Sequence, residues 1–179
     1  RFLRPGGAHQ ARGVAQQVID DFDVANFAGT MTVNYTGVVH GLAALLPAML
    51  GRGTGHVAWI ASAAGYRGLP RAAAYGPTKA ALINLAESLK PELQLKGIRV
   101  SVINPGFVET RLTAQNDFPM PFLMGAEEAA ARTIAGLAAG RFEIAFPRRF
   151  TVVLKLARLL PYLAYFALIR RVVLKGGTQ

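Results

Sequence analysis

Residues 74–81 read Ala-Tyr-Gly-Pro-Thr-Lys-Ala-Ala, near the start of a stretch rich in Ala, Leu, Lys and Glu that predicts a helix over 72–95. Tyr75 and Lys79 are four residues apart, so a helix places both side chains on one face, one turn apart. A lysine ammonium beside a phenol favours the phenolate and lowers a tyrosine pKa from its usual value of about 10. The pair therefore predicts a tyrosine that exchanges a proton near neutral pH, although this spacing alone is common by chance.

Apolar runs on either side of this helix predict buried strands, and longer stretches with three- and four-residue apolar steps predict helices. Helices that alternate with such strands are typical of an α/β domain with a parallel sheet. The expected elements are helices over 24–50, 72–95, 127–139 and 150–174, the last interrupted at Pro161, and strands over 56–61, 98–103 and 142–146.

Polar and turn-forming residues follow two of the predicted strands. Ser62 comes directly after the strand 56–61, and the segment 104–110, Asn-Pro-Gly-Phe-Val-Glu-Thr, begins as a turn that closes the strand 98–103. In open α/β sheets, ligands bind at the carboxyl ends of the strands. We therefore expect Ser62 and this segment to lie at a ligand-binding edge, where the Ser62 hydroxyl can bond a substrate oxygen.

Together, these motifs resemble those of the short-chain dehydrogenase/reductase family in order and in spacing. The resemblance runs from about residue 24 to residue 146. It implies a Rossmann-like, doubly wound parallel sheet and an oxidoreductase that transfers a hydride between NAD or NADP and an alcohol or ketone. The matching positions are Asn34 within Val-Asn-Tyr-Thr-Gly, Ser62, Tyr75 with Lys79, and the Pro105-Gly106 turn with Thr110.

The resemblance also implies a role for each matching residue. Tyr75 is then the general acid/base, Lys79 lowers its pKa and binds the nicotinamide ribose, and Ser62 orients and polarises the substrate oxygen. Asn34 is expected to help hold Lys79 through a water molecule and the backbone. The expected cofactor-binding residues are Tyr75, Lys79, Pro105, Gly106, Val108 and Thr110. The choice between NAD and NADP cannot be read, because the residue that sets it in the family has no counterpart here.

The sequence departs from the family at the glycine-rich turn that binds the cofactor phosphates. The run Gly51-Arg52-Gly53-Thr54-Gly55 precedes a strand and does not open a helix, so it is not such a turn. We expect a partial catalytic domain over 1–148 that lacks its N-terminal strands, followed by a tail over 149–179. The alternative is a non-catalytic or truncated family member that acts as a membrane- or protein-binding module. A serine hydrolase built on Ser62 is disfavoured, because the nucleophile-elbow glycine before it is missing.

Residues 111–125 occupy the place of the family's substrate-binding loop, and many of their side chains are large and apolar. They either pack on the protein's own core or cover an apolar substrate, such as a lipid, steroid, retinoid or long-chain alcohol. The expected substrate-binding residues are Ser62, Phe118, Met120 and Phe122. By resemblance, the two long helices, about 25–50 and 72–96, pair across a homodimer or homotetramer interface.

Composition limits the remaining possibilities. The 179 residues include no cysteine, which excludes disulfides and thiolate metal sites and fits a cytoplasmic protein, and the three histidines share no metal-ligand spacing.

Of the net charge of +10, residues 141–179 carry +7, from eight Lys/Arg and one Glu. The apolar run 159–169 is too short to span a bilayer. Its basic flanks suit an interfacial helix on an anionic membrane, or else it packs against the domain or a second subunit. No nucleic-acid motif accompanies this charge.

Overall fold

Three parallel strands form the centre of the structure, a computed structural model that describes residues 22–111, 113–115 and 120–171. The strands β1 (Gly55–Ile60), β2 (Ile98–Pro105) and β3 (Glu143–Phe146) lie in the order β1-β2-β3. Gly55 pairs with Ile98 and Val102 with Glu143 to set the two registers. The predicted α/β class with a parallel sheet is confirmed, with three strands of a Rossmann-like sheet in the described residues.

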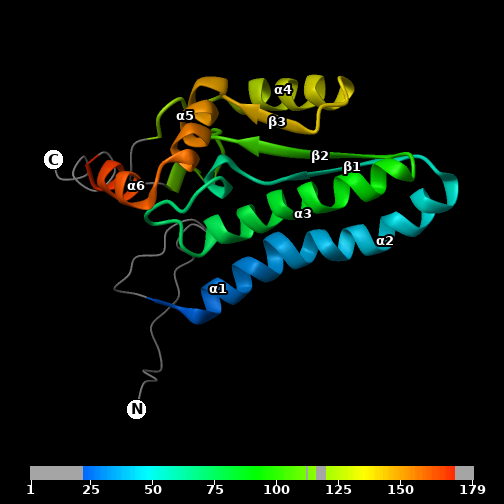
Figure 1. The fold of residues 1–179 in the computed structure, drawn as a ribbon, viewed down its shortest axis with the longest axis horizontal. Coiled ribbons are helices and arrows are strands. Elements are labelled where there is room, and N and C mark those ends of the chain that lie inside the picture. Colours follow the sequence, from blue (N-terminus) through cyan, green and yellow to red (C-terminus); the bar gives the residue numbers. More distant parts are fainter. Residues whose placement is uncertain (1–21, 112, 116–119, 172–179) are drawn as a thin grey trace, which may run out of the picture.

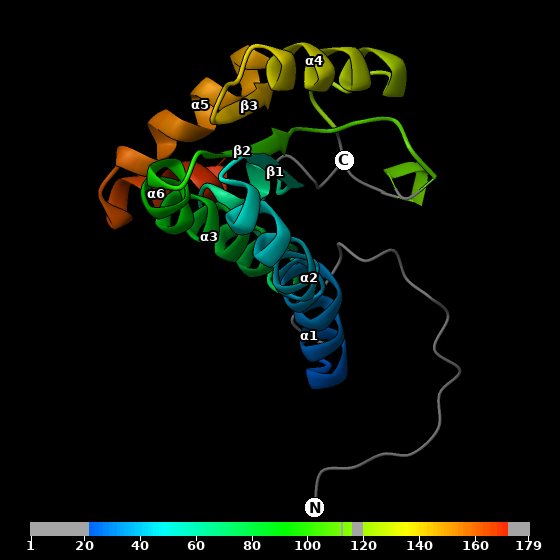
Figure 2. The same ribbon diagram turned by 90° about the vertical axis from the view of Figure 1, so that its right-hand side faces the viewer.

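Helices cover both faces of the sheet, as Figures 1 and 2 show. On one face α3 (Tyr75–Leu95) packs on β2, and the helical stretch made of α1 (Val24–Met31), η2 (Thr32–Thr36) and α2 (Gly37–Arg52) packs on α3 and β1. On the other face α4 (Ala126–Ala138) packs on β3 and β2. The short helices η3 (Ala63–Gly65) and η4 (Thr113–Gln115) lie in connections, and α5 (Arg148–Leu159) and α6 (Tyr162–Ile169) follow β3.

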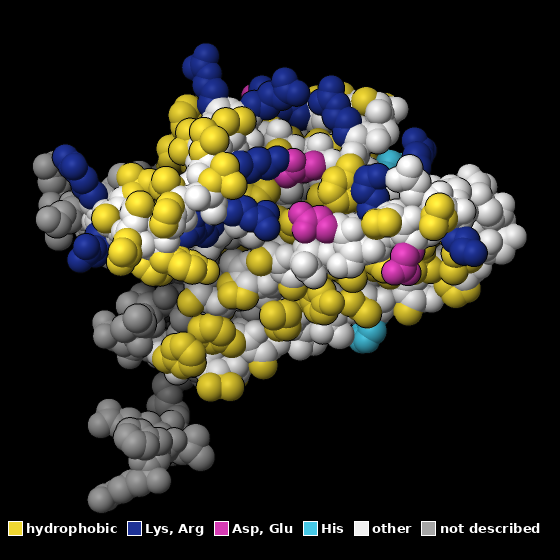
Figure 3. All heavy atoms as spheres, viewed as in Figure 1, with side chains coloured by type: hydrophobic (Ala, Val, Ile, Leu, Met, Phe, Trp, Pro, Cys, Tyr) yellow, Lys and Arg dark blue, Asp and Glu magenta, His cyan; other side chains and the backbone are white. Residues whose placement is uncertain are grey.

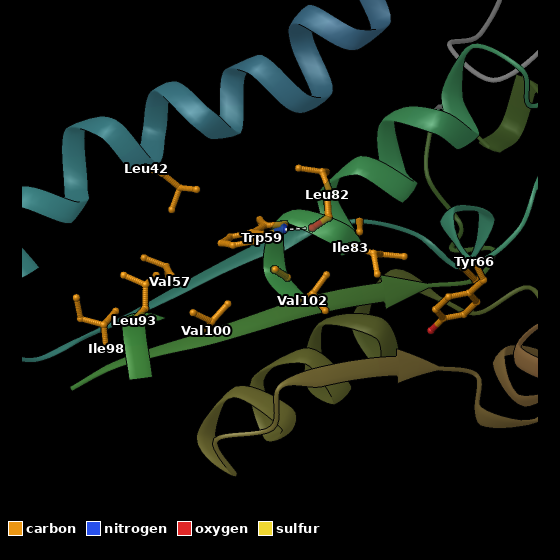
Figure 4. Packing of buried hydrophobic residues seen from close by; sticks show 13 residues of the cluster. Leu42, Val57, Trp59, Tyr66, Leu82, Ile83, Leu93, Ile98, Val100 and Val102 are labelled. Carbon is orange, nitrogen blue, oxygen red and sulfur yellow. Dashed lines mark hydrogen bonds between the residues drawn. The ribbon is translucent and has the colours of Figure 1, made fainter. Parts of the chain in front are cut away.

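Alternation along the strands divides the core in two. Val100 and Val102 of β2 point to the α3 face, whereas Ile103 joins Ile144 and Phe146 under α4. The α3-side core, drawn in Figure 4, includes Trp59, whose indole N–H donates to the Leu82 carbonyl at 2.9 Å. Burial of these large side chains from both layers supplies the main driving force that holds helix to sheet.

Element boundaries differ from the sequence predictions in two informative places. Asn104 and Pro105 belong to β2 and not to a turn, because Pro105 pairs with Phe146 and the strand ends at Pro105. The predicted helix over 24–50 exists, but its middle is a π-helix. By length and composition alone, Val24–Arg52 could also cross a membrane; here one side of it packs on α3 and β1.

Candidate functional site

Ser62 joins the carboxyl ends of β1 and β2. Its backbone is extended and caps η3, and its hydroxyl oxygen accepts the N–H of Ala64 at 3.1 Å. The same hydroxyl lies 3.5 Å from the carbonyl oxygen of Pro105, the last residue of β2. The side chain is therefore held at the strand edge, where the sequence places it, by contacts that leave its hydroxyl able to turn toward a ligand.

Tyr75 and Lys79 lie on the first turns of α3, next to Ser62. Tyr75 opens the helix, and Pro77 is tolerated in this first turn because its missing N–H would have no intrahelical partner. The Tyr75 hydroxyl lies close enough to Ser62 for the serine to lower the pKa of the phenol. The Lys79 ammonium lies 5.4 Å from the centroid of the Tyr75 ring and donates to the Ile60 carbonyl at 3.0 Å. The structure thus brings Ser62, Tyr75 and Lys79 together at the carboxyl edge of the sheet.

The pKa of Tyr75 differs from the sequence expectation. Burial raises the pKa of Tyr75 above its usual value of 10.0, and the nearby Ser62 side chain offsets this only in part. Burial also lowers the pKa of Lys79 below 10.5. The lysine lies by the ring and bonds a backbone carbonyl, so it does not stabilise the phenolate enough to outweigh desolvation in this arrangement. The prediction that the pKa of Tyr75 is lowered is therefore wrong.

Asn34 reaches the Tyr75–Lys79 helix through a residue that sequence reasoning missed. It lies in the π-helical stretch η2, and its Nδ2 donates to the hydroxyl of Thr78 at 3.1 Å. Thr78 is fully buried and donates in turn to the Tyr75 carbonyl at 2.8 Å. Asn34 therefore positions the turn that carries both reactive side chains, by a contact to the residue before Lys79. The sequence feature that could have indicated Thr78 is its position inside the Tyr-x-x-x-Lys motif.

The segment after β2 forms the other wall of the site. The Gly106 N–H bonds the Phe146 carbonyl at 2.7 Å, and a Cβ added to Gly106 would lie 2.9 Å from the Phe150 ring. Only glycine fits this close approach without displacing the aromatic ring. Further along, Val108 bridges to Met124 and accepts a hydrogen bond from the Thr113 hydroxyl at 2.7 Å. These contacts fix the backbone that follows the strand end.

Thr110 closes this segment onto η4. Its hydroxyl accepts the Thr113 N–H at 3.2 Å, and its own N–H donates to the Thr113 hydroxyl at 2.8 Å. The reciprocal pair satisfies two backbone donors at the start of the short helix. Thr110 itself is exposed, so its hydroxyl remains within reach of a ligand at the strand edge.

These residues fit the nicotinamide end of a dinucleotide. The Lys79 ammonium uses one of its three donors on the Ile60 carbonyl, which leaves donors for ribose hydroxyls. Ile60 is 60% exposed beside them, because α4 covers β2 and β3 but not β1. No Gly-x-Gly-x-x-Gly turn that would bind the pyrophosphate occurs in the sequence.

The predicted substrate loop is apolar where the structure describes it. Phe122 is 55% exposed with a left-handed backbone (φ +61°), a costly conformation for a bulky residue. Its ring lies 6.2 Å from that of Phe150, which lies 5.7 Å from that of Phe107. Met120 is half-buried. The predicted substrate residue Phe118 lies outside the described residues.

A partly buried polar cluster around Glu143 was not predicted. Glu143 of β3 accepts hydrogen bonds from the Tyr66 hydroxyl at 2.7 Å and from Asn104 Nδ2 at 2.9 Å, and it pairs with Lys155 of α5. The Asn104 side-chain oxygen is buried without a partner. The cluster ties the loop after Ser62 to β2, β3 and α5. Within the described ranges, no three His, Cys, Asp or Glu side chains are grouped to hold a metal ion.

Known proteins resemble this chain in sequence. The family model for the short chain dehydrogenase matches residues 9–119. An "Uncharacterized oxidoreductase" of Myxococcus xanthus is 42% identical over 143 residues, which cover 80% of this chain and 56% of the relative. A "Dehydrogenase/reductase SDR family protein 7-like" of Drosophila melanogaster is 39% identical over 113 residues, 63% of this chain and 33% of the relative.

Solved structures share the fold. A short chain dehydrogenase from Burkholderia cenocepacia in complex with NADP superposes with a TM-score of 0.74 at 23% identity, covering 87% of this chain and 63% of that one. One from Burkholderia phymatum in complex with NAD gives 0.70 at 24% identity, covering 80% and 61%. The chain spans about half the length of the curated relatives that it matches. With the family model matching well over half of its residues, this chain belongs to the short-chain dehydrogenase family.

Proposed function

We propose that the protein is an NAD- or NADP-dependent oxidoreductase that interconverts an alcohol and a ketone. The observation that carries this proposal is the convergence of Ser62, Tyr75 and Lys79 at the carboxyl edge of a parallel sheet. Family membership, the oxidoreductase names of the relatives, and the dinucleotides in the complexes of similar fold support the proposal. Bound there, the dinucleotide supplies or accepts the hydride.

Ser62, Tyr75 and Lys79 have separate roles toward the substrate oxygen. The Ser62 hydroxyl hydrogen-bonds the substrate oxygen and polarises its bond to carbon. The Tyr75 hydroxyl exchanges a proton with that oxygen. Because its pKa is raised by burial, Tyr75 holds its proton at neutral pH, and this is the form that protonates the oxygen of a ketone during reduction. Lys79 holds a positive charge within 5.4 Å of the ring, which favours the phenolate that remains.

Positioning comes from residues behind the site. Asn34 and Thr78 fix the first turn of α3, so the two reactive groups keep their separation. Pro105, Gly106, Val108 and Thr110 would hold the nicotinamide end of the cofactor. We further propose an apolar substrate, because the aromatic chain Phe107–Phe150–Phe122 borders the segment after β2 and Phe122 remains exposed. Met120 and Phe118 complete the proposed substrate-facing set.

The whole protein is proposed to be a cytoplasmic homodimer or homotetramer. The absence of cysteine fits the compartment, and exposed apolar side chains on α2, such as Leu45 and Leu50, support pairing of the long helices. Sedimentation of the parent and of a Leu45→Glu variant tests the interface, which the charge should weaken.

The decisive experiment follows NADH and NADPH oxidation with a panel of aliphatic and aromatic ketones, using the whole protein. We expect turnover that falls by about 100-fold or more in Tyr75→Phe and in Ser62→Ala, since each loses a group that touches the reacting oxygen. Tyr162→Phe serves as the matched control, because Tyr162 is exposed on α6 and has no part in the proposed site. Saturable dinucleotide binding without turnover on any ketone or alcohol would favour the non-catalytic alternative.

A further inference from the structure

The helices α5 and α6 carry a set of exposed apolar side chains. Figure 3 shows yellow side chains gathered over both helices, with dark blue Lys and Arg at the margins. Leu159, the last residue of α5, is 79% exposed, and Leu163, in the first turn of α6, is 88% exposed. The exposed members are Val152, Val153, Leu156, Leu159, Tyr162, Leu163, Phe166 and Leu168, which we call the α5–α6 surface.

Hydrogen bonds and ring contacts fix the α5–α6 surface to the rest of the domain. Arg67 donates to the carbonyl oxygens of Arg158 at 3.1 Å and Leu160 at 2.8 Å, at the carboxyl end of α5. Its guanidinium also lies 3.8 Å from the centroid of the Tyr165 ring. Tyr165 is buried and bonds the Gly68 carbonyl. The inner side of α6 is thus fixed to the loop after Ser62, while its outer side faces away from the core.

All charged side chains on α5 and α6 themselves are basic, and one of them, Lys155, pairs with Glu143 of β3. Residues 148–171 contain six Lys or Arg and no acidic residue, and the basic residues flank the apolar run. The basic members are Arg148, Arg149, Lys155, Arg158, Arg170 and Arg171. An aromatic and aliphatic face bordered by cations matches the interface of a bilayer, in which acyl chains lie beneath a layer of anionic phosphates.

The same charge argues against a second copy as the occupant. A two-fold pairing of this surface would place basic margin against basic margin, in a chain whose net charge is already +10. Chain added to the sheet beyond β1 would not cover it either, because β1 is the strand farthest from α5 in the order β1-β2-β3. We propose that the α5–α6 surface docks the protein on anionic membranes as an interfacial anchor, without spanning them.

Flotation of the whole protein with vesicles tests this proposal, and it does not depend on enzymatic turnover. We expect the protein to float with vesicles of phosphatidylcholine mixed with phosphatidylglycerol, and at least fivefold less with phosphatidylcholine alone. Salt should weaken binding as the Debye length falls from about 10 Å at 0.1 M to about 3 Å at 1 M. A Leu159→Ser, Leu163→Ser double variant should lose most of the bound fraction. Leu95→Ser, 87% exposed at the far end of α3, should bind like the parent.

Two further variants separate charge from apolar contact. Arg170→Gln with Arg171→Gln should reduce binding to the anionic vesicles several-fold, whereas Arg52→Gln with Lys96→Gln, exposed at the ends of α2 and α3, should not. A Leu163→Trp probe should be quenched by brominated acyl chains, which the buried Trp59 cannot reach. Equal binding of the serine double variant and the parent, or dimers that the double variant abolishes without any vesicle binding by the parent, would overturn the proposal.

Discussion

Gly65 lies against the backbone of α3 so closely that a Cβ added to it would stand 2.7 Å from the carbonyl carbon of Lys79. The contact presses the loop that starts at Ser62 onto the turn that carries the reactive lysine. Ser62 and Lys79 are separated by a loop and a helical turn in the sequence, and this close approach keeps them together. The small residue at position 65 is therefore part of how the site is built.

We predict that Gly65→Ala destabilises the protein by about 1–3 kcal/mol, as overpacking against rigid backbone does. It should also lower turnover, since Ser62 moves with the loop. Urea unfolding measures the first effect and ketone reduction the second. Gly68→Ala is the matched control, because a Cβ there meets nothing within 4 Å. If the two variants were equally stable, the contact would not constrain the loop.

The hydrogen bond between Asn34 and Thr78 should couple the long N-terminal helix to the reactive turn. A double-mutant cycle of Asn34→Ala and Thr78→Val is expected to give a coupling free energy of unfolding of about 1 kcal/mol, typical of one part-buried hydrogen bond. Both single variants should also lose activity, because the first turn of α3 loses a support. Asn84→Ala, on the exposed side of α3, should be nearly neutral in both assays. Additive single effects would show that the bond contributes nothing.

Much of this arrangement could be predicted from the sequence, because local patterns determine it. The strand positions follow from apolar runs, and the Tyr75–Lys79 geometry follows from helical spacing. The π-helix over Thr32–Thr36 could not be predicted, since one extra residue per turn leaves three- and four-residue apolar steps almost unchanged. Asn34 lies in this π-helix, and its partner Thr78 was not predicted either.

Long-range polar contacts and pKa directions also lie beyond local patterns. Tyr66 and Glu143 are 77 residues apart, and nothing near either residue in the sequence indicates the other. The spacing of Tyr75 and Lys79 predicts their proximity but not how deeply each is buried. Desolvation depends on everything packed around a group, and here it reverses the expected shift of the tyrosine pKa.

Burial of the charged Lys79 side chain should lower the stability of the fold, and this cost should shrink as the pH rises. Burial lowers the pKa of Lys79 below 10.5, so between the two values the folded chain binds fewer protons than the unfolded chain, and stability rises with pH. We expect Lys79→Met to abolish turnover, and its stability relative to the parent to be greatest near pH 7 and to decline as the pH approaches about 10.5. Urea unfolding of the variant and the parent at both pH values measures this difference. A constant difference across the range would contradict the role of burial.

Charged Glu143 should stabilise the fold at neutral pH and lose that stabilisation in acid. Burial alone would raise its pKa, but hydrogen bonds from Lys155, Tyr66 and Asn104 outweigh this and lower the pKa below 4.5. A carboxyl with a depressed pKa stabilises the fold above its unfolded value and loses that stabilisation as the pH falls through the folded value. Glu143→Gln should therefore cost about 2 kcal/mol at neutral pH, since hydrogen bonds to a charged group are lost, and progressively less in acid.

Unfolding of Glu143→Gln and of the parent from neutral pH to below pH 4.5 tests the last prediction. Glu128→Gln provides the control, because Glu128 pairs with Arg132 on the exposed face of α4 and such pairs contribute at most about 0.5 kcal/mol. A second effect should appear in the glutamine variant. Tyr66, in the loop from Ser62 to Tyr75, bonds Glu143 of β3, so ketone turnover should fall with stability. Full turnover at neutral pH in a destabilised variant would show that the cluster holds the fold and not the site.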